Sequence, residues 1–360
     1  MAVRLNWLIY GAGAIGTYIG VSLILHGQKV VFIEQPAAAS EILEHGLRLN
    51  IRGQEHRILH PEMTSDIPLA LRKASFDIAV FALKSYDTHA FLDAMLPYVH
   101  LLPPVLCLQN GVENEAAIET IMGKGNVIAG TVTSSIRRRG PGDVLLERLR
   151  GVGVASGHPL STTITQGLSE SGLNAQLISS ASAMKWSKML TNLLANASSA
   201  ILDMTPEEIL HHPRLYAMEI TQLREAISVM QAHHINLANL PGTQVKPFAW
   251  LVDNLPPWLS RFLLSRIASQ GRGHKMPSFH IDLYSGSQRS EVDYLNGAVV
   301  RFGAMLNIPT PVNVWLNQTL QSLTQGKLPL EIYSHQPDKY LLALNSYIES
   351  EKTNFHSIVP

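Results

Sequence analysis

The sequence predicts an α/β fold in which an N-terminal domain with a parallel sheet precedes an all-α C-terminal domain. Three observations support this prediction. Apolar strands alternate with helices through the first half, a glycine-rich turn joins the first strand to the first helix, and the second half is rich in Ala, Leu and Met. A chain of 360 residues is long enough for two domains of roughly 150 residues each. The predicted domains are 1–179 and 180–360.

The first half alternates in the way that a doubly wound sheet requires. A continuous apolar run such as 76–83 is typical of a parallel strand that is buried on both faces. The expected strands are 5–10, 29–33, 76–83 and 105–109, the expected helices are 14–26, 86–98 and 113–122, and a hairpin is expected from 46–50 and 56–59. The Val-, Thr- and Gly-rich segment 127–156 is expected to add two or three mostly antiparallel strands that close the sheet.

The second half is expected to be helical over 183–202, 213–236 and 290–307. Residues 241–276, which hold several prolines and two tryptophans, look like an insertion. One part of it, 250–267, is apolar enough to lie on a membrane surface. The Pro-Pro pair inside that part instead favours two short helices, which could form a substrate lid or a dimer contact.

The composition excludes several classes of protein. The 28 basic and 28 acidic residues cancel, so the chain lacks the basic excess that is typical of nucleic-acid-binding proteins. Its single cysteine, Cys107, cannot form a disulfide within the chain and lies in an apolar segment that predicts a buried thiol. The uncharged stretch 5–25 is interrupted by glycines, which argues against a membrane span or a signal peptide. We therefore expect a cytoplasmic protein that binds neither nucleic acid nor membranes.

A Gly-x-Gly-x-x-Gly motif follows the first expected strand and begins the first expected helix. In such a turn the first glycine allows the bend, the second lets a pyrophosphate approach the backbone, and the third lets helix and strand pack closely. The N–H groups at the helix start then face the phosphates. The motif predicts a Rossmann-type dinucleotide-binding domain with cofactor contacts at Gly11, Ala12, Gly13, Ala14, Ile15 and Gly16. A tight turn without a ligand is the alternative.

An acidic residue ends the second expected strand. Glu34 follows the first glycine at the distance where a carboxylate typically accepts hydrogen bonds from the adenosine ribose. A carboxylate would repel the 2′-phosphate of NADP, and no arginine is adjacent to Glu34, so the residues favour NAD(H). A solvated glutamate at a strand end is the alternative.

Polar residues interrupt the apolar helix that is expected after residue 180. Lys188, Asn192 and Asn196 are spaced by four residues, which places them on one helix face as either an exposed stripe or a polar site. Lys185 is a competing lysine one turn earlier. Glu291 precedes another helical run, where a carboxylate either belongs to a site or simply stabilises the helix start.

These motifs, taken in order, resemble the ketopantoate reductase (2-dehydropantoate 2-reductase) family. The resemblance spans roughly residues 5–320 and depends on the ordered set rather than on any one motif. The set comprises the glycine turn, Leu83-Lys84, Gln109-Asn110-Gly111, the Lys188, Asn192 and Asn196 series, and the run that begins at Glu291.

The resemblance implies a role for each matched residue. Lys188, rather than Lys185, matches the family's proton donor, and Glu291 matches its catalytic glutamate. The substrate-binding positions of the family fall on Asn110, Asn192, Asn196 and, less directly, Ser278. Further cofactor contacts fall on Lys84, Asn110 and Ile136.

The chain also departs from the family pattern. NADP-using members carry an arginine where this sequence has Gln35, so the resemblance implies NADP(H) while Glu34 and the missing arginine favour NAD(H). The segment 241–276 is enlarged, and about 30 residues after Leu330 have no family counterpart.

The implied reaction is hydride transfer from NAD(P)H to a 2-oxo acid, with 2-dehydropantoate reduced to pantoate in pantothenate and coenzyme A biosynthesis. Lys188 would act as the general acid and Glu291 would hydrogen-bond the substrate hydroxyl. Two alternatives stay open: an NAD-dependent hydroxy-acid dehydrogenase with another oxo acid, and a non-catalytic dinucleotide-sensing regulator, which would need neither residue.

Two further expectations concern partners and metals. We expect a homodimer that acts on a small molecule. The pairs His211-His212 and His233-His234 are poor chelators, because adjacent side chains on a helix point about 100° apart, so no metal site is expected.

Overall fold

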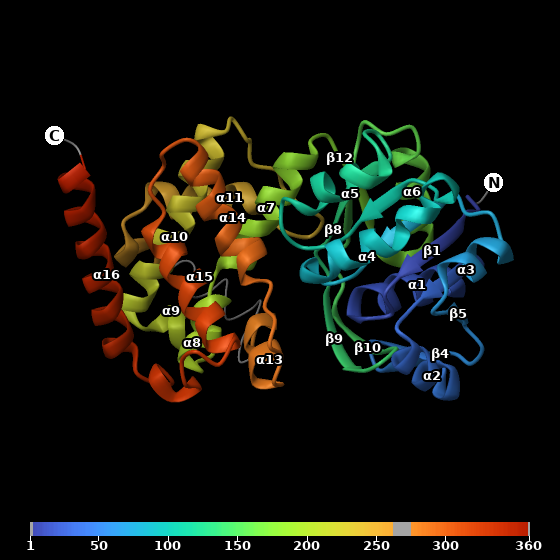
Figure 1. Ribbon diagram of the computed structural model, residues 1–360, viewed down its shortest axis with the longest axis horizontal. Coiled ribbons are helices and arrows are strands. Elements are labelled where there is room, and N and C mark those ends of the chain that lie inside the picture. The colour runs from blue at the N-terminus through green and yellow to red at the C-terminus, as the bar shows by residue number, and fades with distance from the viewer. Residues whose placement is uncertain (1–2, 262–274, 359–360) are drawn as a thin grey trace. The chain divides into compact units, whose positions relative to one another are not determined.

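The computed structural model describes residues 3–261 and 275–358, with the side chains of 352–358 excepted. The chain divides into two compact units (Figure 1). The first unit comprises Met1–Lys188 with Leu237–Gln244, and the second comprises Met189–Asn236 with Val245–Pro360. This division passes through helix α7 (Ala181–Leu193), nine residues after the predicted boundary at 179.

The first unit is built on an eight-stranded sheet with the order β12-β11-β8-β7-β6-β1-β2-β5. All neighbouring strands are parallel except β8 and β11. The strands are β1 (Asn6–Tyr10), β2 (Lys29–Ile33), β5 (Glu62–Thr64), β6 (Ile78–Phe81), β7 (Val105–Cys107), β8 (Val127–Val132), β11 (Val152–Ala155) and β12 (Ala175–Ile178). The predicted parallel α/β fold is therefore confirmed, and a single antiparallel junction extends it.

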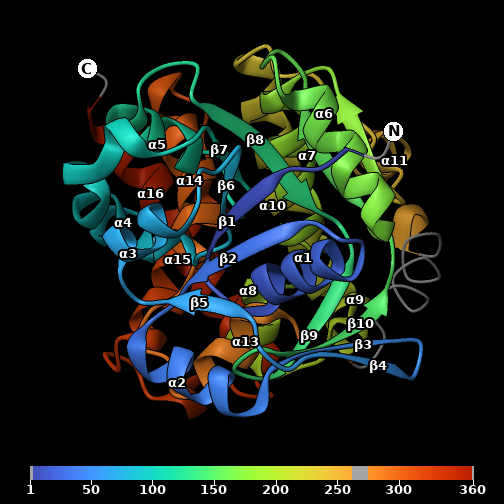
Figure 2. The same ribbon diagram turned by 90° about the vertical axis from the view of Figure 1, so that its right-hand side faces the viewer.

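Helices cover both faces of this sheet, as Figure 2 shows for α1 in front of the strands. One apolar cluster joins α1 (Ala14–Leu25) and α6 (Ser161–Leu168) to one face. A second cluster joins α3 (Ile67–Lys73), α4 (Thr88–Met95) and α5 (Asn114–Met122) to the other. Because both faces are covered, strands such as β6 are apolar at every position, which is what the continuous run in the sequence indicated.

A second, smaller sheet lies against the opposite side of α1. It has the order β4-β3-β10-β9, formed by β3 (Leu47–Ile51), β4 (Gln54–Ile58), β9 (Ser135–Gly140) and β10 (Asp143–Arg148). The predicted hairpin is confirmed as β3 and β4, whose turn residues Arg52 and Gly53 both have positive φ, as a two-residue hairpin requires. The prediction that all strands of 127–156 close the main sheet is wrong, because β10 pairs with β3 of the hairpin and β9 pairs with β10.

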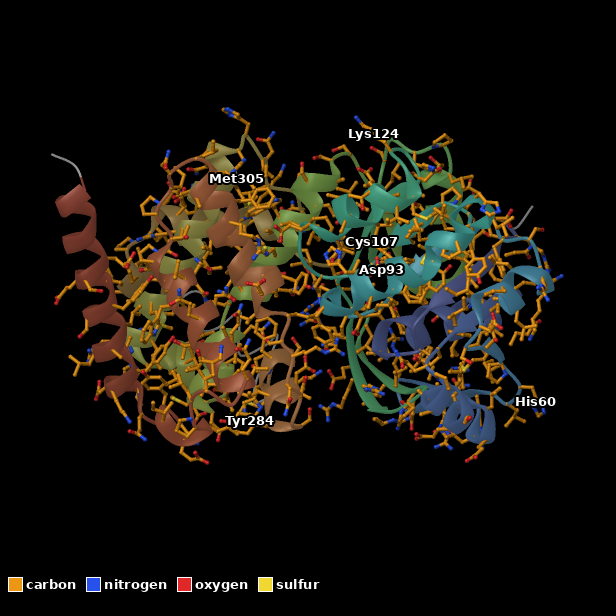
Figure 3. All side chains as sticks on the ribbon, viewed as in Figure 1. His60, Asp93, Cys107, Lys124, Tyr284 and Met305 are labelled. Carbon is orange, nitrogen blue, oxygen red and sulfur yellow. The ribbon has the colours of Figure 1, made fainter. Side chains whose placement is uncertain are left out.

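The second unit is helical within the residues that the structure describes. Its helices are α8 (Ala197–Leu202), α9 (Pro206–His211), α10 (Pro213–Ala232), α11 (Val245–Asn254), α13 (Ser278–Tyr284), α14 (Val292–Met305), α15 (Pro311–Thr324) and α16 (Pro337–Ile358). Helix α10 is buried along most of its length and contacts α14, α15 and α16. Figure 3 marks Tyr284 and Met305 at the ends of α13 and α14.

The predicted insertion 241–276 is only partly described. Its first residues pack against the first unit, where the Thr133 hydroxyl donates to the Pro241 carbonyl at 2.7 Å. Helix α11 follows, and residues 262–274 lie outside the described part of the chain. The predictions of a lid, of a dimer contact and of a membrane-surface helix fall partly on those residues and stay predictions.

The single helix that was predicted over 183–202 is wrong. Helix α7 ends at Leu193, and α8 begins at Ala197. Between them Ala195 has a φ of 51°, a left-handed conformation that an α-helix cannot contain. Asn196 therefore does not continue the face of α7 that Lys188 and Asn192 share.

Candidate active site

The predicted cofactor contacts of the first unit, except Ile136, gather at one edge of its sheet. The glycine turn follows β1, Glu34 follows β2, Lys84 lies three residues beyond β6, and Asn110 lies three residues beyond β7. These four strands are adjacent and parallel, in the order β2-β1-β6-β7. The carboxyl ends of parallel strands form the edge where α/β sheets bind ligands.

The glycine turn is shaped by close contacts on one side and by open space on the other. Gly11 has a φ of 90°, and its N–H donates to the carbonyl of Ile33 at 2.9 Å. A Cβ on Gly16 would lie 1.8 Å from the carbonyl oxygen of Gly11, so helix and turn could not pack. A Cβ on Gly13 would meet no atom within 4 Å. The turn therefore leaves space beside Gly13, at the start of α1, for a group that approaches the backbone.

Glu34 is tied to this turn. Its carboxylate accepts a hydrogen bond from the N–H of Ala12 and another from the N–H of Gln35 at 2.8 Å. The side chain is half-buried and the neighbouring Gln35 is exposed. The carboxylate is thus held beside the turn, and a ribose hydroxyl could donate to it there.

A buried glutamine holds the next two strand ends together. The side chain of Gln109 donates to the carbonyl oxygens of Leu83 and Lys84 and to the Thr88 hydroxyl at 2.8 Å. The carbonyl of Asn110 accepts from Ser85 at 2.9 Å, while the Asn110 side chain is exposed. Gln109 belongs to a motif of the sequence but has no predicted role there. A polar side chain directly after the apolar run 105–108 is the sequence feature that could have revealed one.

Ile136, the weakest of the cofactor assignments, lies on β9 and not at the sheet edge itself. It follows the carboxyl end of β8 by four residues, and its side chain packs against the core that α1 shares with both sheets. Its backbone contact with a cofactor stays a prediction.

Lys185 is a structural lysine of the first unit. Its ammonium lies 2.7 Å from the Glu115 carboxylate and donates to the carbonyl of Gln109 at 2.6 Å. Burial opposes the charged form, but the Glu115 carboxylate outweighs it and raises the pKa of Lys185. In the sequence, Lys185 is only a rival for Lys188. The structure shows that it anchors α7 to the sheet.

The thiol beside this ion pair is inert. Cys107 is fully buried in the first unit (Figure 3), as predicted. Burial and the nearby Glu115 carboxylate raise the pKa of its thiol well above the usual range.

Lys188 and Asn192 share one face of α7. Both are half-buried, whereas Met189, Leu190 and Leu193 are buried. Of the two lysines on this helix, Lys188 is therefore the more accessible. The spacing of four residues places an ammonium and an amide next to each other on this face.

Asn196 and the start of α13 are brought together within the second unit. Asn196 is buried, and its side-chain oxygen accepts from the N–H of Phe279 at 3.3 Å. Ser278 immediately precedes Phe279 and is the first residue of α13. Two of the predicted substrate-binding residues thus lie next to each other although about 80 residues separate them in the sequence.

Glu291 is the residue before α14 and is buried. A carboxylate at a helix start interacts favourably with the helix dipole. The position of Glu291 is therefore compatible with the alternative that it only stabilises the start of α14. Its proposed contact with substrate stays a prediction.

The polar groups at the sheet edge fit a dinucleotide. The start of α1 and the space beside Gly13 suit an anionic pyrophosphate, and the Glu34 carboxylate suits a ribose. Within the described residues, no group of three or more His, Cys, Asp or Glu side chains could hold a metal ion. No helix in the same residues is long and apolar enough to cross a membrane.

Comparison with known proteins decides the family. The model for ketopantoate reductase PanE/ApbA matches residues 7–156, and the model for the C-terminal part of the same family matches 181–324. The chain belongs to the ketopantoate reductase family. It is accordingly an NAD(P)H-dependent oxidoreductase of the 2-dehydropantoate 2-reductase type. Helix α16 lies beyond the matched residues, as the sequence predicted for the C-terminal extension.

Relatives of the family match almost their whole length. The 2-dehydropantoate 2-reductase of Lactococcus lactis is 28% identical over 323 residues, which are 87% of this chain and 96% of that protein. The 2-dehydropantoate 2-reductase of Pyrococcus horikoshii is 25% identical over 313 residues, which are 86% of this chain and 94% of that protein.

Two solved structures are similar to a comparable degree. A PanE/ApbA family ketopantoate reductase from Ralstonia eutropha has a TM-score of 0.75 and 26% identity, covering 90% of this chain and 99% of that one. D-mandelate dehydrogenase with NADH and anilino(oxo)acetate has a TM-score of 0.75 and 25% identity, covering 89% and 99%. Similarity therefore does not separate a ketopantoate reductase from a dehydrogenase of another hydroxy acid.

Proposed function

We propose that this protein reduces a 2-oxo acid with NAD(P)H and that 2-dehydropantoate is its substrate. The proposal is supported by the family, by the curated relatives, and above all by α7, where Lys188 and Asn192 share an accessible face. A non-catalytic dinucleotide sensor would need no such pair, so their joint presence argues against that alternative.

The first unit would hold the dinucleotide. The glycine turn would receive the pyrophosphate, Glu34 the adenosine ribose, and the segments of Lys84 and Asn110 the remaining length of the cofactor. When bound, the nicotinamide supplies the hydride. The chain's own residues have to orient the oxo acid and stabilise the charge that develops on its oxygen.

Lys188 would act as the general acid. An alkoxide that forms from a keto group needs a proton, and an ammonium can supply both the proton and a compensating positive charge. Lys185 cannot take this role, because its ammonium is bound to Glu115 and to the carbonyl of Gln109.

Neutral amides and hydroxyls would orient the substrate. Asn192, Asn196 and Ser278 would donate hydrogen bonds to the carboxylate and hydroxyl ends, and Asn110 would contact both substrate and cofactor. Glu291 would accept a hydrogen bond from the product hydroxyl. Amide and hydroxyl donors fix orientation without adding charge, so the developing alkoxide interacts mainly with Lys188.

A second candidate is an NAD-dependent dehydrogenase of another 2-hydroxy acid. It is favoured by Glu34, whose carboxylate beside the glycine turn would repel a 2′-phosphate, and by the similarity to D-mandelate dehydrogenase with NADH.

A substrate panel distinguishes the two candidates. The purified protein is mixed with NADH or NADPH and with 2-dehydropantoate, an aryl 2-oxo acid or a branched aliphatic 2-oxo acid, and coenzyme oxidation is followed at 340 nm. The highest kcat/KM with 2-dehydropantoate supports the first proposal. A higher value with another oxo acid supports the second candidate, and cofactor binding without turnover on any of the acids refutes both.

Removal of the negative charge of Glu34 tests whether this residue binds the adenosine ribose. Glu34→Gln can still accept the Ala12 N–H through its amide oxygen but no longer repels a phosphate. We expect the ratio of kcat/KM for NADPH over NADH to rise by about tenfold, equivalent to ~1.4 kcal/mol. Glu62→Gln, which changes an exposed carboxylate on β5, is the matched control. An unchanged ratio in both variants contradicts the assignment of Glu34 to the ribose.

A further inference from the structure

The break between α7 and α8 is not explained by the residues that form it. Ala195 adopts a φ of 51°, a left-handed conformation that is unfavourable for a residue with a Cβ. The surrounding sequence is rich in Ala, Leu and Met, which favour a continuous helix. The conformation therefore has to be held by contacts from another element.

Two side chains of α10 supply those contacts. The carboxylate of Glu219 accepts the N–H of Ala195 at 2.7 Å and the hydroxyl of Ser198. The side chain of Gln222, one turn further along α10, donates to the carbonyl of Leu193 at 3.3 Å and to Glu219. Groups that a continuous helix would pair internally are thus paired with α10 instead.

A carboxylate at the position of Glu219, beside the α7–α8 break, is unfavourable unless it is compensated. The side chain of Glu219 is 0% exposed, and a carboxylate loses its favourable hydration when it is buried. A buried carboxylate recovers that cost only when its oxygens accept several hydrogen bonds. Glu219 accepts three such hydrogen bonds, from Ala195 and Ser198 at the break and from Gln222 on α10.

The break determines where the amide of Asn196 lies. The N–H of Asn196 donates to the carbonyl of Leu193 at 3.2 Å, and its side-chain oxygen accepts from Phe279 at 3.3 Å. With that oxygen engaged, the NH₂ group of the amide is the part that can donate to an anionic ligand. In a continuous helix Asn196 would lie on the face of Lys188, away from this position.

We propose that Glu219 is a positioning residue, whose carboxylate holds the α7–α8 break and so orients Asn196 toward the carboxylate of the oxo acid. The proposal rests on the proposed function, in which Asn196 binds that carboxylate. Glu219 touches neither substrate nor cofactor in this scheme, and it acts through Ala195 and Asn196.

Three variants test the proposal. Glu219→Ala removes the acceptor. Glu219→Gln keeps an amide oxygen for Ala195 and Gln222, while its NH₂ can donate to the Ser198 oxygen. Glu225→Ala is the matched control, because Glu225 is a buried carboxylate on the same helix that accepts the N–H groups of Val312 and Asn313 instead.

The first readout is steady-state kinetics with the oxo acid that the panel identifies. Asn196 contributes to ground-state binding, so Glu219→Ala is expected to raise KM for the oxo acid by roughly 10–100-fold, with kcat and the Kd for the coenzyme changed less than threefold. Glu219→Gln is expected to stay within about threefold of the wild-type KM. Glu225→Ala is expected to lower the melting temperature without this rise in KM.

The second readout does not depend on activity. Amide hydrogen exchange in residues 193–198 is expected to accelerate in Glu219→Ala and not in Glu225→Ala. If Glu219→Ala does not fold, Glu219→Asp, which withdraws the carboxylate by one methylene, replaces it in both measurements.

The results separate the two proposals. A rise in KM that is equal in the Glu219→Ala and Glu225→Ala variants, or exchange at 193–198 that is unchanged, overturns the role of Glu219. If the wild-type protein reduces no oxo acid, the proposed function fails, and the role of Glu219 in orienting Asn196 for substrate fails with it. The exchange data then still show whether Glu219 holds the break.

Discussion

Lys185 is buried and Lys188 is half-buried, so their substitutions are expected to have different effects. Lys188→Ala is expected to lower kcat by about 10²–10⁴-fold, the usual contribution of one general acid, with little effect on stability. Lys185→Ala should instead cost about 3–5 kcal/mol of folding free energy, because it leaves the Glu115 carboxylate without its ion pair.

Kinetics and urea denaturation of both variants check this prediction. The two effects should be separable, with activity lost in one protein and stability in the other. Near-normal turnover in Lys188→Ala would remove that residue from the mechanism, and unchanged unfolding in Lys185→Ala would show that the ion pair contributes little.

Glu225 predicts how stability depends on pH. Burial raises the pKa of this carboxyl to about 7, although the N–H groups of Val312 and Asn313 favour the charged form. The unfolded chain has an ordinary carboxyl pKa, so the folded protein binds the proton more tightly. The stability from this group is complete below about pH 4.5 and falls by up to about 3 kcal/mol as the pH rises through 7.

Urea unfolding at pH 5.5 and pH 8 measures this contribution as a difference between wild type and Glu225→Gln. The variant cannot titrate at this position, so its stability should change less between the two pH values. An identical pH dependence in the two proteins would show that Glu225 keeps an ordinary pKa.

At the scale of elements, the glycine turn separates packing from binding. Gly16→Ala places a Cβ 1.8 Å from the Gly11 carbonyl oxygen, and we expect a strong loss of stability. Gly13→Ala meets open space at a φ of −72°, which alanine adopts easily. It should leave the melting temperature almost unchanged and weaken coenzyme binding by about tenfold or more, since the methyl group occupies the space beside the backbone.

Differential scanning fluorimetry and coenzyme titration of the two variants test this contrast. Unaltered coenzyme affinity in Gly13→Ala would mean that the turn does not receive the pyrophosphate.

Elements whose causes are local were predictable from the sequence. The hairpin of β3 and β4 has its own turn signal in Arg52 and Gly53, and the strand ends follow from the parallel alternation. The α7–α8 break was not predictable, because Ala195 depends on Glu219, which lies on another helix. The role of Lys185 was not predictable either, because it depends on another element. Its buried ammonium forms an ion pair with Glu115, a residue on α5.

The partnership of β9 and β10 was also missed. Their alternation indicates strands but does not reveal which strand they pair with. The structure pairs β10 with β3, a strand far away in the sequence, so no local pattern could have placed them in the second sheet.

At the scale of the whole molecule, the C-terminal extension is an integral part of the second unit. Helix α16 buries Tyr340, Leu341 and Leu344 and contacts α10 and α15. Burial and the charge of Glu219 raise the pKa of the Tyr340 hydroxyl well above its usual range. Residues beyond the family's matched region thus reach the helix that holds the break.

Two substitutions on α16 test this packing. Tyr340 is 0% exposed and Leu342 is 67% exposed. Tyr340→Ala is expected to lower the free energy of unfolding by about 3–5 kcal/mol, and Leu342→Ala by less than about 0.5 kcal/mol. Chemical denaturation measures both, and equal small losses would mean that α16 is only loosely attached.

The parallel pairing of β3 with β10 has a consequence for synthesis on the ribosome. Arg48 pairs with Asp143, so the hairpin has to wait for its partner strand, a delay of roughly 5–20 s at ordinary elongation rates. During that interval Leu47 and Leu49, which are fully buried in the finished protein, are partnered only by what has already emerged. A nascent chain that stops before β10 therefore carries β3 with one unpaired strand edge, the condition under which unfinished chains associate with one another.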